Sequence, residues 1–469
     1  MNLILTGSNF LFPLITFPYV SRVLGPEGTG KVAFATSFIT YFTMFASFGV
    51  ATYGVRAIAQ SRDDKTQLAK TTQEILCINL VMMLIAYILF AISLFISDRL
   101  WQEKELIVIT SSLIFFTILG VEWFYKGIEQ YQYITVRTII FRCIALIVTF
   151  ILVHTESDYV IFGVITVFAT IGSSIINLFK LRSYIPFEIY KNYNFSRHLK
   201  PMFLLFLTSF AIAIYTNTDT TMLGFIRNDT DVGFYNAAVR VKVILLGVVT
   251  SLGVVLLPRL SYYIEHNMLD EFSIALNKSV NFIMLIALPV AIFFILFAKE
   301  TILVLAGENY VESILPLQIV MATVVLVGIT NILGIQVLLP LKRDGALLIS
   351  VLIAAVVDIL LNLFFIPTLG ATGAAISTTV AELVVLVVQC YFVRNYLKIL
   401  FSKIQYVKII LAIITSSLIS KIFDEYLDFS LFVTLVISGV IFFLIYFLIL
   451  FLLKEKFLSD VIKKFKFTT

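Results

Sequence analysis

Seven ionisable residues lie inside otherwise apolar segments of this sequence, and they are the residues best placed to do chemistry. They are Glu122, Arg142, Asp219, Arg240, Lys242, Asp358 and Glu382. A charge inside an apolar segment of membrane length costs roughly 2.5 kcal/mol or more, so it is retained where it has a partner or lines a wet cavity. These residues are therefore the first candidates for a binding or ion-coupling site.

The basic residues of this set could hold an anion. Arg240 is the strongest candidate, because its planar guanidinium binds two oxygens of a phosphate group at once. Asn236 precedes Arg240 by one helical turn and shares its face, whereas Lys242 points about 200° away from Arg240. Lys242 is therefore a second anion ligand only if the helix is distorted. The alternatives are that its side chain extends to the membrane surface or pairs with an acidic residue in a structural role. Arg22, at the end of the first apolar segment, is either a cavity cation or an interfacial anchor.

Two of the acidic residues have a basic residue at similar depth. Glu122 and Arg142 lie in neighbouring apolar segments, which favours an ion pair between them. Arg142 is also a candidate ligand for an anion, and Glu122 is a candidate polar residue of a cavity. Asp219 belongs to a run of five polar residues, 217–221, and lies about 7.5 Å from the end of its helix at 1.5 Å per residue. We expect Asp219 to pair with Arg240 or to line a polar cavity.

Asp358 and Glu382 lie near the middle of two consecutive apolar segments, and Asn362 follows Asp358 by one helical turn. Carboxylates at this depth favour a site that binds and releases H⁺ or Na⁺. The alternative is hydrogen bonding between helices, with partners such as Asn331 or Gln389. Both interpretations stay open on the sequence.

Enzymatic chemistry is not expected from this chain. None of its three histidines and three cysteines lies near another, so we expect no catalytic residue, no metal ligand set and no cofactor. The segment GPEGTGKV at 25–32 resembles a phosphate-binding loop, but Val32 stands where that motif needs Ser or Thr to hold magnesium. We interpret the segment as a Gly-rich turn between two helices.

The composition places nearly the whole chain in a membrane. Of the 469 residues, 60% are hydrophobic and 13% are charged, against roughly 25% charge in a soluble protein, and the mean hydropathy is +1.01. About fourteen apolar runs are bounded by charge, Pro or Gly, and most have roughly the 20 residues that cross a bilayer as a helix. We therefore expect an all-α integral membrane protein with about 14 transmembrane helices.

The positions of the basic residues predict the orientation of these helices. With the amino terminus in the cytoplasm, 24 of the 34 Lys and Arg residues fall on the cytoplasmic side and 7 on the opposite side. An excess of this kind is typical of cytoplasmic loops, so we expect both termini in the cytoplasm. The net charge of +5 then reflects topology, and we expect no nucleic-acid partner.

An internal repeat divides the chain. Gly30 and Arg56 recur as Gly233 and Arg259, each 203 residues later. Two repeats in the same orientation are typical of transporters whose substrate site lies near the midplane between the halves. We expect an N-terminal six-helix lobe at 1–183, a cytoplasmic linker at 184–200, a C-terminal six-helix lobe at 201–396, and two extra helices with a basic cytoplasmic tail at 397–469.

Four stretches of the chain resemble the Wzx-type polysaccharide flippases. They are FPLITFPYVSRVLGPEGTGKVAFA at 12–35, FGVATYGVRAIAQ at 48–60, KGIEQYQYITVRTIIFR at 126–142 and PTLGATGAAIST at 367–378. The resemblance implies the multidrug/oligosaccharidyl-lipid/polysaccharide exporter fold, in which two pseudo-symmetric six-helix lobes surround a central cavity and two helices follow. In related lipid II flippases, arginines on spans one and eight serve the pyrophosphate, and the nearest residues here are Arg22 and Arg240.

The resemblance also implies a function. We expect a secondary transporter, not an enzyme, that flips undecaprenyl-pyrophosphate-linked oligosaccharide units across a bacterial cytoplasmic membrane by alternating access. The product would feed O-antigen, capsule or exopolysaccharide synthesis, and the partners would be this substrate, the bilayer, a polysaccharide polymerase and the chain-length machinery. The alternatives are a multidrug or cation antiporter of the same fold and, less favoured because no long outside loop is present, a membrane polysaccharide polymerase.

Overall fold

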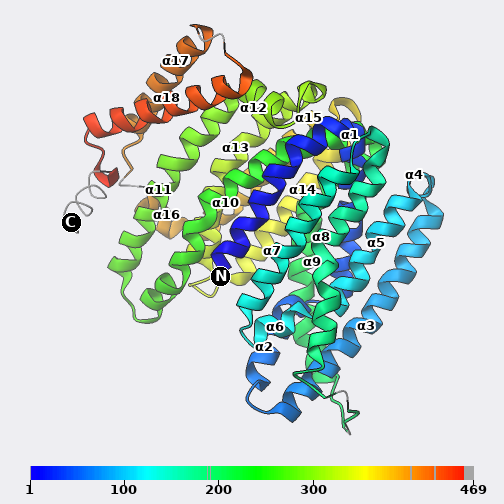
Figure 1. Ribbon diagram of the computed structural model, residues 1–469. Helices are drawn as coiled ribbons and strands as arrows, with labels where there is room; N and C mark the ends of the chain where they lie inside the picture. Colours follow the sequence, from blue (N-terminus) through cyan, green and yellow to red (C-terminus); the bar gives the residue numbers. More distant parts are fainter. Residues whose placement is uncertain (1, 187, 191, 402–403, 427–428, 459–469) are drawn as a thin grey trace. The chain divides into compact units, whose positions relative to one another are not determined.

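The computed structural model describes residues 2–186, 188–190, 192–401, 404–426 and 429–458, and the regular elements within these ranges are all helices (Figure 1). Among them, 13 segments are long and apolar enough to cross a membrane. The first, Leu11–Ser61, has 51 residues, or about 76 Å at 1.5 Å per residue, which is enough for two crossings of a ~30 Å hydrocarbon core. The expected all-α, multi-span membrane protein is confirmed.

The first long helix, α1 (Asn2–Ser47), is broken at Gly25. The φ of 65° and ψ of −178° at Gly25 are accessible because glycine has no Cβ. Pro26 then begins the second half of α1, where its missing N–H has no helical partner to lose. Gly49, with φ of 77°, separates α1 from α2 (Val50–Ser61) in the same way. The predicted Gly-rich turn is therefore a one-residue break between two helices.

The chain separates into two compact units, Met1–Gly233 and Phe234–Thr469, called unit 1 and unit 2. Besides α1 and α2, unit 1 contains α3 (Lys65–Ile96), α4 (Asp98–Gln102), α5 (Lys104–Leu119), α6 (Glu122–Gly127), α7 (Tyr131–Leu152), the 3-10 turn η1 (Glu156–Asp158), α8 (Tyr159–Leu181), α9 (Ser196–Ile226) and the start of α10 (Asp229–Glu265). The sequence repeat divides the chain differently, into two six-helix lobes joined by a linker at 184–200. That division rests on the similarity of the two halves and not on their compactness, and it stays a prediction.

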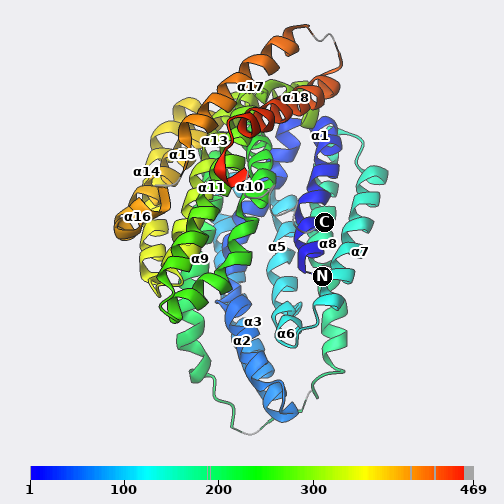
Figure 2. The same cartoon turned by 90° about the vertical axis from the view of Figure 1, so that its left-hand side faces the viewer.

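Helix α1 lies at the centre of unit 1. It contacts α3, α5, α7, α8 and α9, while the short helix α2 packs on α3, α6 and α9 (Figures 1 and 2). The end of unit 1 that carries α2 and α6 is called the α2 end, and the opposite end, which carries α4 and η1, is called the α4 end. The long helix α9 runs along α1 between these two ends.

Aromatic side chains fill the α2 end of unit 1. Phe124 and Tyr125 are fully buried, and Tyr125 lies with its ring centroid 5.2 Å from that of Tyr133 on α7. Asn177 on α8 joins this core to two other elements, because its side chain donates to the Gly120 carbonyl oxygen at 2.6 Å and its own carbonyl oxygen accepts from the Tyr125 hydroxyl at 2.6 Å. The beginning of α7 and the end of α8 are thereby fixed to the same core.

Unit 2 holds the remaining helices. They are the rest of α10, α11 (Leu269–Leu296), α12 (Ala298–Leu305), the 3-10 segment η2 (Glu308–Ser313), α13 (Ile314–Asn331), the π-helix η3 (Ile332–Leu338), α14 (Asp344–Leu369), α15 (Ala371–Phe392), α16 (Arg394–Phe401), α17 (Tyr406–Tyr426) and α18 (Leu431–Leu452). Helices α13 and α14 both pack on α15, and α17 pairs with α18 (Figures 1 and 2).

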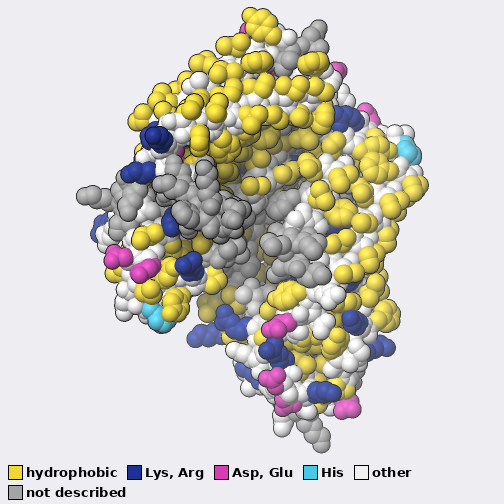
Figure 3. Space-filling model, turned by 60° about the vertical axis from the view of Figure 1, so that its left-hand side comes forward, with side chains coloured by type: hydrophobic (Ala, Val, Ile, Leu, Met, Phe, Trp, Pro, Cys, Tyr) yellow, Lys and Arg dark blue, Asp and Glu magenta, His cyan; other side chains and the backbone are white. Residues whose placement is uncertain are grey.

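Hydrophobic side chains cover much of the face shown in Figure 3. Large apolar residues lie on the outside of both units: Phe95 on α3 is 75% exposed and Phe364 on α14 is 73% exposed. Helices that are apolar on their outer as well as their inner faces are typical of membrane spans. The surface therefore agrees with the expectation drawn from composition.

Candidate functional site

Two glycines bring α1 into backbone contact with the turn between α9 and α10 at the α4 end. A Cβ atom on Gly30 would overlap the Asp229 carbonyl oxygen, and a Cβ atom on Gly233 would overlap the Pro26 carbonyl oxygen. Gly30 and Gly233 are equivalent in the sequence repeat, and Pro26 and Asp229 are separated by the same 203 residues. The contact is thus reciprocal between the two segments, and only glycine permits so close an approach.

Arg99 on α4 adds an ionic contact at the same place. Its Nη2 pairs with the Asp229 carboxylate, its Nε donates to the Gly224 carbonyl oxygen at 3.1 Å, and its guanidinium lies 5.4 Å from the centroid of the Phe34 ring. The Asp229 side chain is 7% exposed, so this pair is largely shielded from water. One arginine therefore joins α4, α1 and the start of α10.

The segment that resembled a phosphate-binding loop has a structural role beside this contact. The Lys31 ammonium lies 3.1 Å from Glu27 and 3.0 Å from Glu103, and 4.6 Å from the centroid of the Tyr159 ring. Lys31 thus connects α1 with the beginnings of α5 and α8. The residues of this segment position helices at the α4 end.

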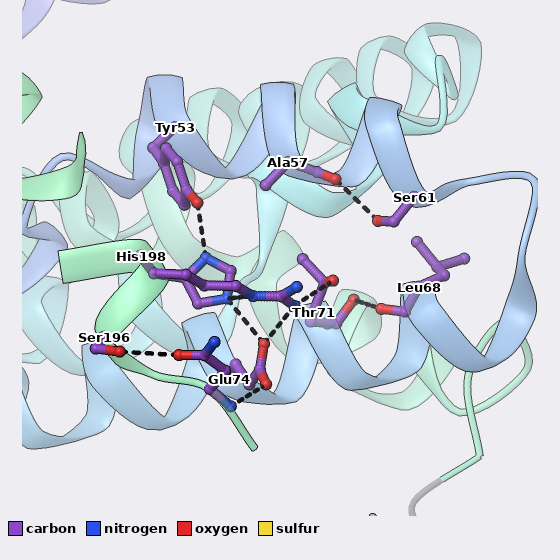
Figure 4. A network of polar contacts seen from close by, with 11 residues as sticks. Tyr53, Ala57, Ser61, Leu68, Thr71, Glu74, Ser196 and His198 are labelled. Carbon is purple, nitrogen blue, oxygen red and sulfur yellow. Dashed lines mark hydrogen bonds and ion pairs between the residues drawn. The ribbon is translucent and has the colours of Figure 1, made fainter. Parts of the chain in front are cut away.

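A buried polar network fastens α9 to α3 at the α2 end (Figure 4). Glu74 on α3 has no solvent exposure, and its Oε2 lies 2.6 Å from Nη2 of Arg197 and 2.8 Å from Nε2 of His198. Its Oε1 accepts the backbone N–H of Asn194 at 2.6 Å. The Tyr53 hydroxyl lies 2.7 Å from Nδ1 of His198, which extends the network to α2. Every polar atom of the Glu74 side chain is satisfied.

Polar contacts also join α1 and α9 between these ends. The Ser37 hydroxyl donates to the Asn217 carbonyl oxygen at 3.1 Å and lies 3.1 Å from the Thr221 hydroxyl. Part of the polar run 217–221 therefore faces α1, and Asp219 within it is 5% exposed. Helix α9 is held to the rest of unit 1 at both ends and in the middle.

The structure corrects one predicted pairing in unit 1. Within 4 Å, the partners of Glu122 are Lys126 at 2.7 Å and Arg137 at 3.9 Å, and Nη1 of Arg142 donates to the Ser8 hydroxyl at 2.6 Å. Arg142 follows Arg137 by five residues, which places it about 7.5 Å further along α7. Glu122, at the first turn of α6, therefore meets the nearer arginine.

The other predicted cation of unit 1 is exposed. Arg22 lies one turn before the break in α1, and its Nη1 donates to the carbonyl oxygen of Pro18 at 2.6 Å, within the same helix. Its role as an anion ligand or an interfacial anchor stays a prediction, as does that of Arg142.

In unit 2, the candidate residues come from α10, α14 and α15. Asn236, Arg240 and Lys242 lie on α10 and are partly exposed within the described chain. Asp358 on α14 is 1% exposed and accepts from Nδ2 of Asn362, one turn later, at 3.3 Å. Asp219 and Arg240 belong to different compact units, so their pairing stays a prediction.

Glu382 is buried on α15, which packs on α14. Gln389, which the sequence suggests as a hydrogen-bond partner between helices, forms another contact. Nε2 of Gln389 donates to the Ser350 hydroxyl at 3.3 Å, which joins α15 to α14. The Tyr235 hydroxyl lies 2.8 Å from that of Thr378, which joins α10 to α15. A coupling site for H⁺ or Na⁺ at Asp358 and Glu382 stays a prediction.

The sequence interpretation missed Glu74, His198 and Arg99. Glu74 and His198 lie just before apolar runs and looked like loop residues, and 124 residues separate them in the chain. Arg99 is one of the 7 basic residues predicted on the side opposite the cytoplasm, and its sequence neighbours give no further sign of its role. Periodicity and local charge carry no signal for such distant pairs, so covariation between positions would be needed to find them.

Comparison with known proteins identifies relatives over most of the chain. Residues 1–264 match the family described as "Polysaccharide biosynthesis protein". A putative O-antigen transporter of Escherichia coli (strain K12) is 29% identical over 400 residues, which cover 84% of this chain and 95% of the relative. A putative O-antigen transporter of Shigella dysenteriae is 25% identical over 391 residues, covering 81% and 95%.

Two solved structures share the fold. The inward closed conformation of the lipid II flippase MurJ aligns with a TM-score of 0.77 at 19% identity and covers 98% of this chain and 99% of that chain. The inward-facing conformation of a multidrug resistance MATE family transporter of the MOP superfamily aligns with a TM-score of 0.63 at 16% identity and covers 83% and 94%. At these identities the likeness concerns the fold.

Proposed function

The chain belongs to the polysaccharide biosynthesis protein family, and from this membership we propose that it flips a lipid-linked oligosaccharide across a membrane. The observation that carries the proposal is the family match, together with two relatives named O-antigen transporters that align over more than four fifths of the chain. The substrate is an undecaprenyl-pyrophosphate-linked oligosaccharide unit, and the membrane is the bacterial cytoplasmic membrane. A polysaccharide polymerase and chain-length machinery are the proposed downstream partners.

Alternating access gives the two ends of unit 1 opposite roles in this proposal. The α2 end faces the cytoplasm, because basic loop residues such as Lys65, Lys126 and Arg182 lie there. The contact of Gly30 with Asp229 and the Arg99–Asp229 pair then hold helices together on the outer side. These contacts would have to separate when the outer side opens.

The residue roles follow from the chemistry of the substrate. A pyrophosphate carries oxygens that guanidinium groups bind in pairs, so Arg240 is its main proposed ligand, with Arg22, Arg142 and Lys242 as further cations. Asp358 and Glu382 are the proposed coupling residues for H⁺ or Na⁺. The remaining polar residues proposed to line the cavity are Glu122, Asp219 and Asn236.

Reconstitution tests the proposal directly. The purified full-length chain is placed in liposomes that contain a fluorescent undecaprenyl-pyrophosphate oligosaccharide, and flipping is followed by quenching from outside. Flipping above empty vesicles is expected. Arg240→Ala should lower the rate about 10- to 100-fold, the effect of losing a charged hydrogen bond, whereas Arg343→Ala, at the exposed start of α14, should leave it unchanged.

A second candidate function is a multidrug or cation antiporter, favoured by the shared fold with the multidrug transporter. The same liposomes, loaded with an organic cation, distinguish the two. Robust cation efflux without oligosaccharide flipping would replace the flippase by the antiporter. Flipping without cation efflux would exclude the antiporter.

A further inference from the structure

A groove of about 510 Å³ opens between α7 and α8 at the α2 end. Two of the residues that line it each carry a buried polar atom with no hydrogen-bond partner in the described part of the chain: Nε of Arg137 and the hydroxyl of Tyr133. Arg137 is 6% exposed, and Gln130 and Gln132 line the same groove. Buried polar groups are nearly always paired in folded proteins, so these two donors indicate that a ligand with acceptor oxygens completes the site.

The charges around the groove favour an anion. The Lys180 ammonium lies 3.5 Å from the centroid of the Tyr133 ring, and no carboxylate of the described chain lies within 4 Å of it. Arg137 has one carboxylate, Glu122, at 3.9 Å, and Glu122 is already engaged by Lys126 at 2.7 Å. Three cations, Lys126, Arg137 and Lys180, therefore lie at this end of α7 and α8 with the carboxylate of Glu122, while Glu129, just before α7, is paired with Arg62 at 2.8 Å.

Asn177 fixes the arginine in place. Nη1 of Arg137 donates to the side-chain oxygen of Asn177, whose nitrogen in turn donates to the Gly120 carbonyl oxygen. The guanidinium also lies 5.3 Å from the Tyr133 ring centroid. Arg137 is thus oriented by the core, and its buried Nε has no hydrogen-bond partner in the described part of the chain, which is the arrangement of a preformed binding group rather than of a solvated surface charge.

An apolar stripe leads away from the groove along α7. Val136 and Ile140 line the groove itself, and the exposed side chains of Ile144, Ile147 and Ile151 continue the same face towards the α4 end. The stripe from Val136 to Ile151 is about 22 Å long at 1.5 Å per residue, enough for an acyl chain in one leaflet of a ~30 Å hydrocarbon core. The polar donors at the end of α7 suit a lipid headgroup, and the apolar stripe beside them suits its acyl chain.

We propose that this groove binds the headgroup phosphate of an anionic phospholipid from the leaflet at the α2 end, with one acyl chain along the α7 stripe. Tyr133, Arg137 and Lys180 contact the phosphate oxygens. A basic pocket between membrane helices at headgroup depth is a recurring mode of binding for such lipids. The excess of cations favours an anionic headgroup over a zwitterionic one.

Native mass spectrometry of the purified full-length protein in detergent tests this proposal. Phosphatidylglycerol, phosphatidylcholine and farnesyl diphosphate are the three probes, each added in a concentration series. The wild-type chain is expected to retain one phosphatidylglycerol at lower concentration than phosphatidylcholine. Lys180→Gln should raise the apparent Kd for phosphatidylglycerol about fivefold, the contribution of one lysine near an anionic surface.

Two further variants control for folding and for non-specific attraction. Tyr133→Phe removes only an oxygen that has no hydrogen-bond partner among the described residues, so it should weaken phosphatidylglycerol binding without lowering the Tm. Lys104→Gln is the matched control, because Lys104 lies 4.9 Å from the Trp101 ring centroid in a groove of similar size, but beside a carboxylate, Glu105. Lys104→Gln should leave phosphatidylglycerol binding unchanged.

Each contrary result overturns the proposal. Equal affinity for phosphatidylglycerol and phosphatidylcholine, or equal effects of Lys180→Gln and Lys104→Gln, would show that the groove does not select a headgroup. Displacement of phosphatidylglycerol by farnesyl diphosphate at far lower concentration would assign the groove to a prenyl diphosphate instead. The measurement does not depend on flipping, so it stands apart from the proposed function.

Discussion

At the scale of single residues, a full set of partners marks a charge as structural. Glu74 is fully buried and has a donor at each oxygen, which is the signature of a charge kept for stability. Arg240 and Lys242 are partly exposed on α10. Sequence analysis identified the second kind, because a charge inside an apolar run is visible without knowledge of its partner.

Glu74→Gln should destabilise the protein. The substitution keeps the size of the side chain but removes the buried charge that Arg197 and His198 contact, a loss of about 1–3 kcal/mol. Thermal unfolding in detergent should show a lower Tm than for the wild-type chain. Glu27→Gln is the control, because Glu27 is 67% exposed and Lys31 keeps its second partner, Glu103. Equal Tm values for the two variants would contradict a stabilising role for the network.

At the scale of elements, the sequence predicted the membrane-spanning helices but not which helices pack against one another. Apolar runs and the positions of Gly25 and Pro26 predicted the helices and the turn, since both depend on local residues. The repeat placed Gly30 and Gly233 in equivalent positions, but their contact required the structure. Glu122 was assigned to the wrong arginine because span boundaries from sequence are uncertain by a few residues, enough to exchange Arg137 for Arg142.

Gly30→Ala should force α1 away from the turn between α9 and α10. The added Cβ overlaps backbone atoms, which no side-chain rotation can relieve, and overpacking of this kind costs about 1–3 kcal/mol. Thr29 lies beside this contact and is 8% exposed. When Thr29 is replaced by Cys in a chain without other cysteines, the accessibility of the new thiol reports whether α1 has moved away from the turn. Labelling of that cysteine by a maleimide should be about tenfold faster in the Gly30→Ala chain.

Gly7→Ala is the matched control for the glycine contact. Gly7 lies on the same helix, and a Cβ there meets nothing within 4 Å. Labelling of the Thr29→Cys reporter should therefore match the parent chain. An unchanged labelling rate in both glycine variants would mean that the contact does not hold the two helices together.

At the scale of the whole molecule, the proposed orientation is set by many weak contributions rather than by one motif. Each loop charge favours the cytoplasmic side by a modest amount, so the excess of 24 over 7 basic residues determines the outcome only as a sum. The structure of unit 1 assigns these loops to ends: Ser183, after α8, lies at the α2 end, and Ser157, in η1, lies at the α4 end. Both serines are exposed.

These two serines make a matched pair for testing the orientation. Ser183→Cys and Ser157→Cys are each introduced into a cysteine-free chain, expressed in intact bacterial spheroplasts and treated with a membrane-impermeant maleimide. Because positive charge is retained in the cytoplasm, the cysteine at 157 should label from outside, and the cysteine at 183 only after permeabilisation. The reverse pattern would place the α4 end, with the Gly30 and Arg99 contacts, on the cytoplasmic side and would contradict the proposed orientation.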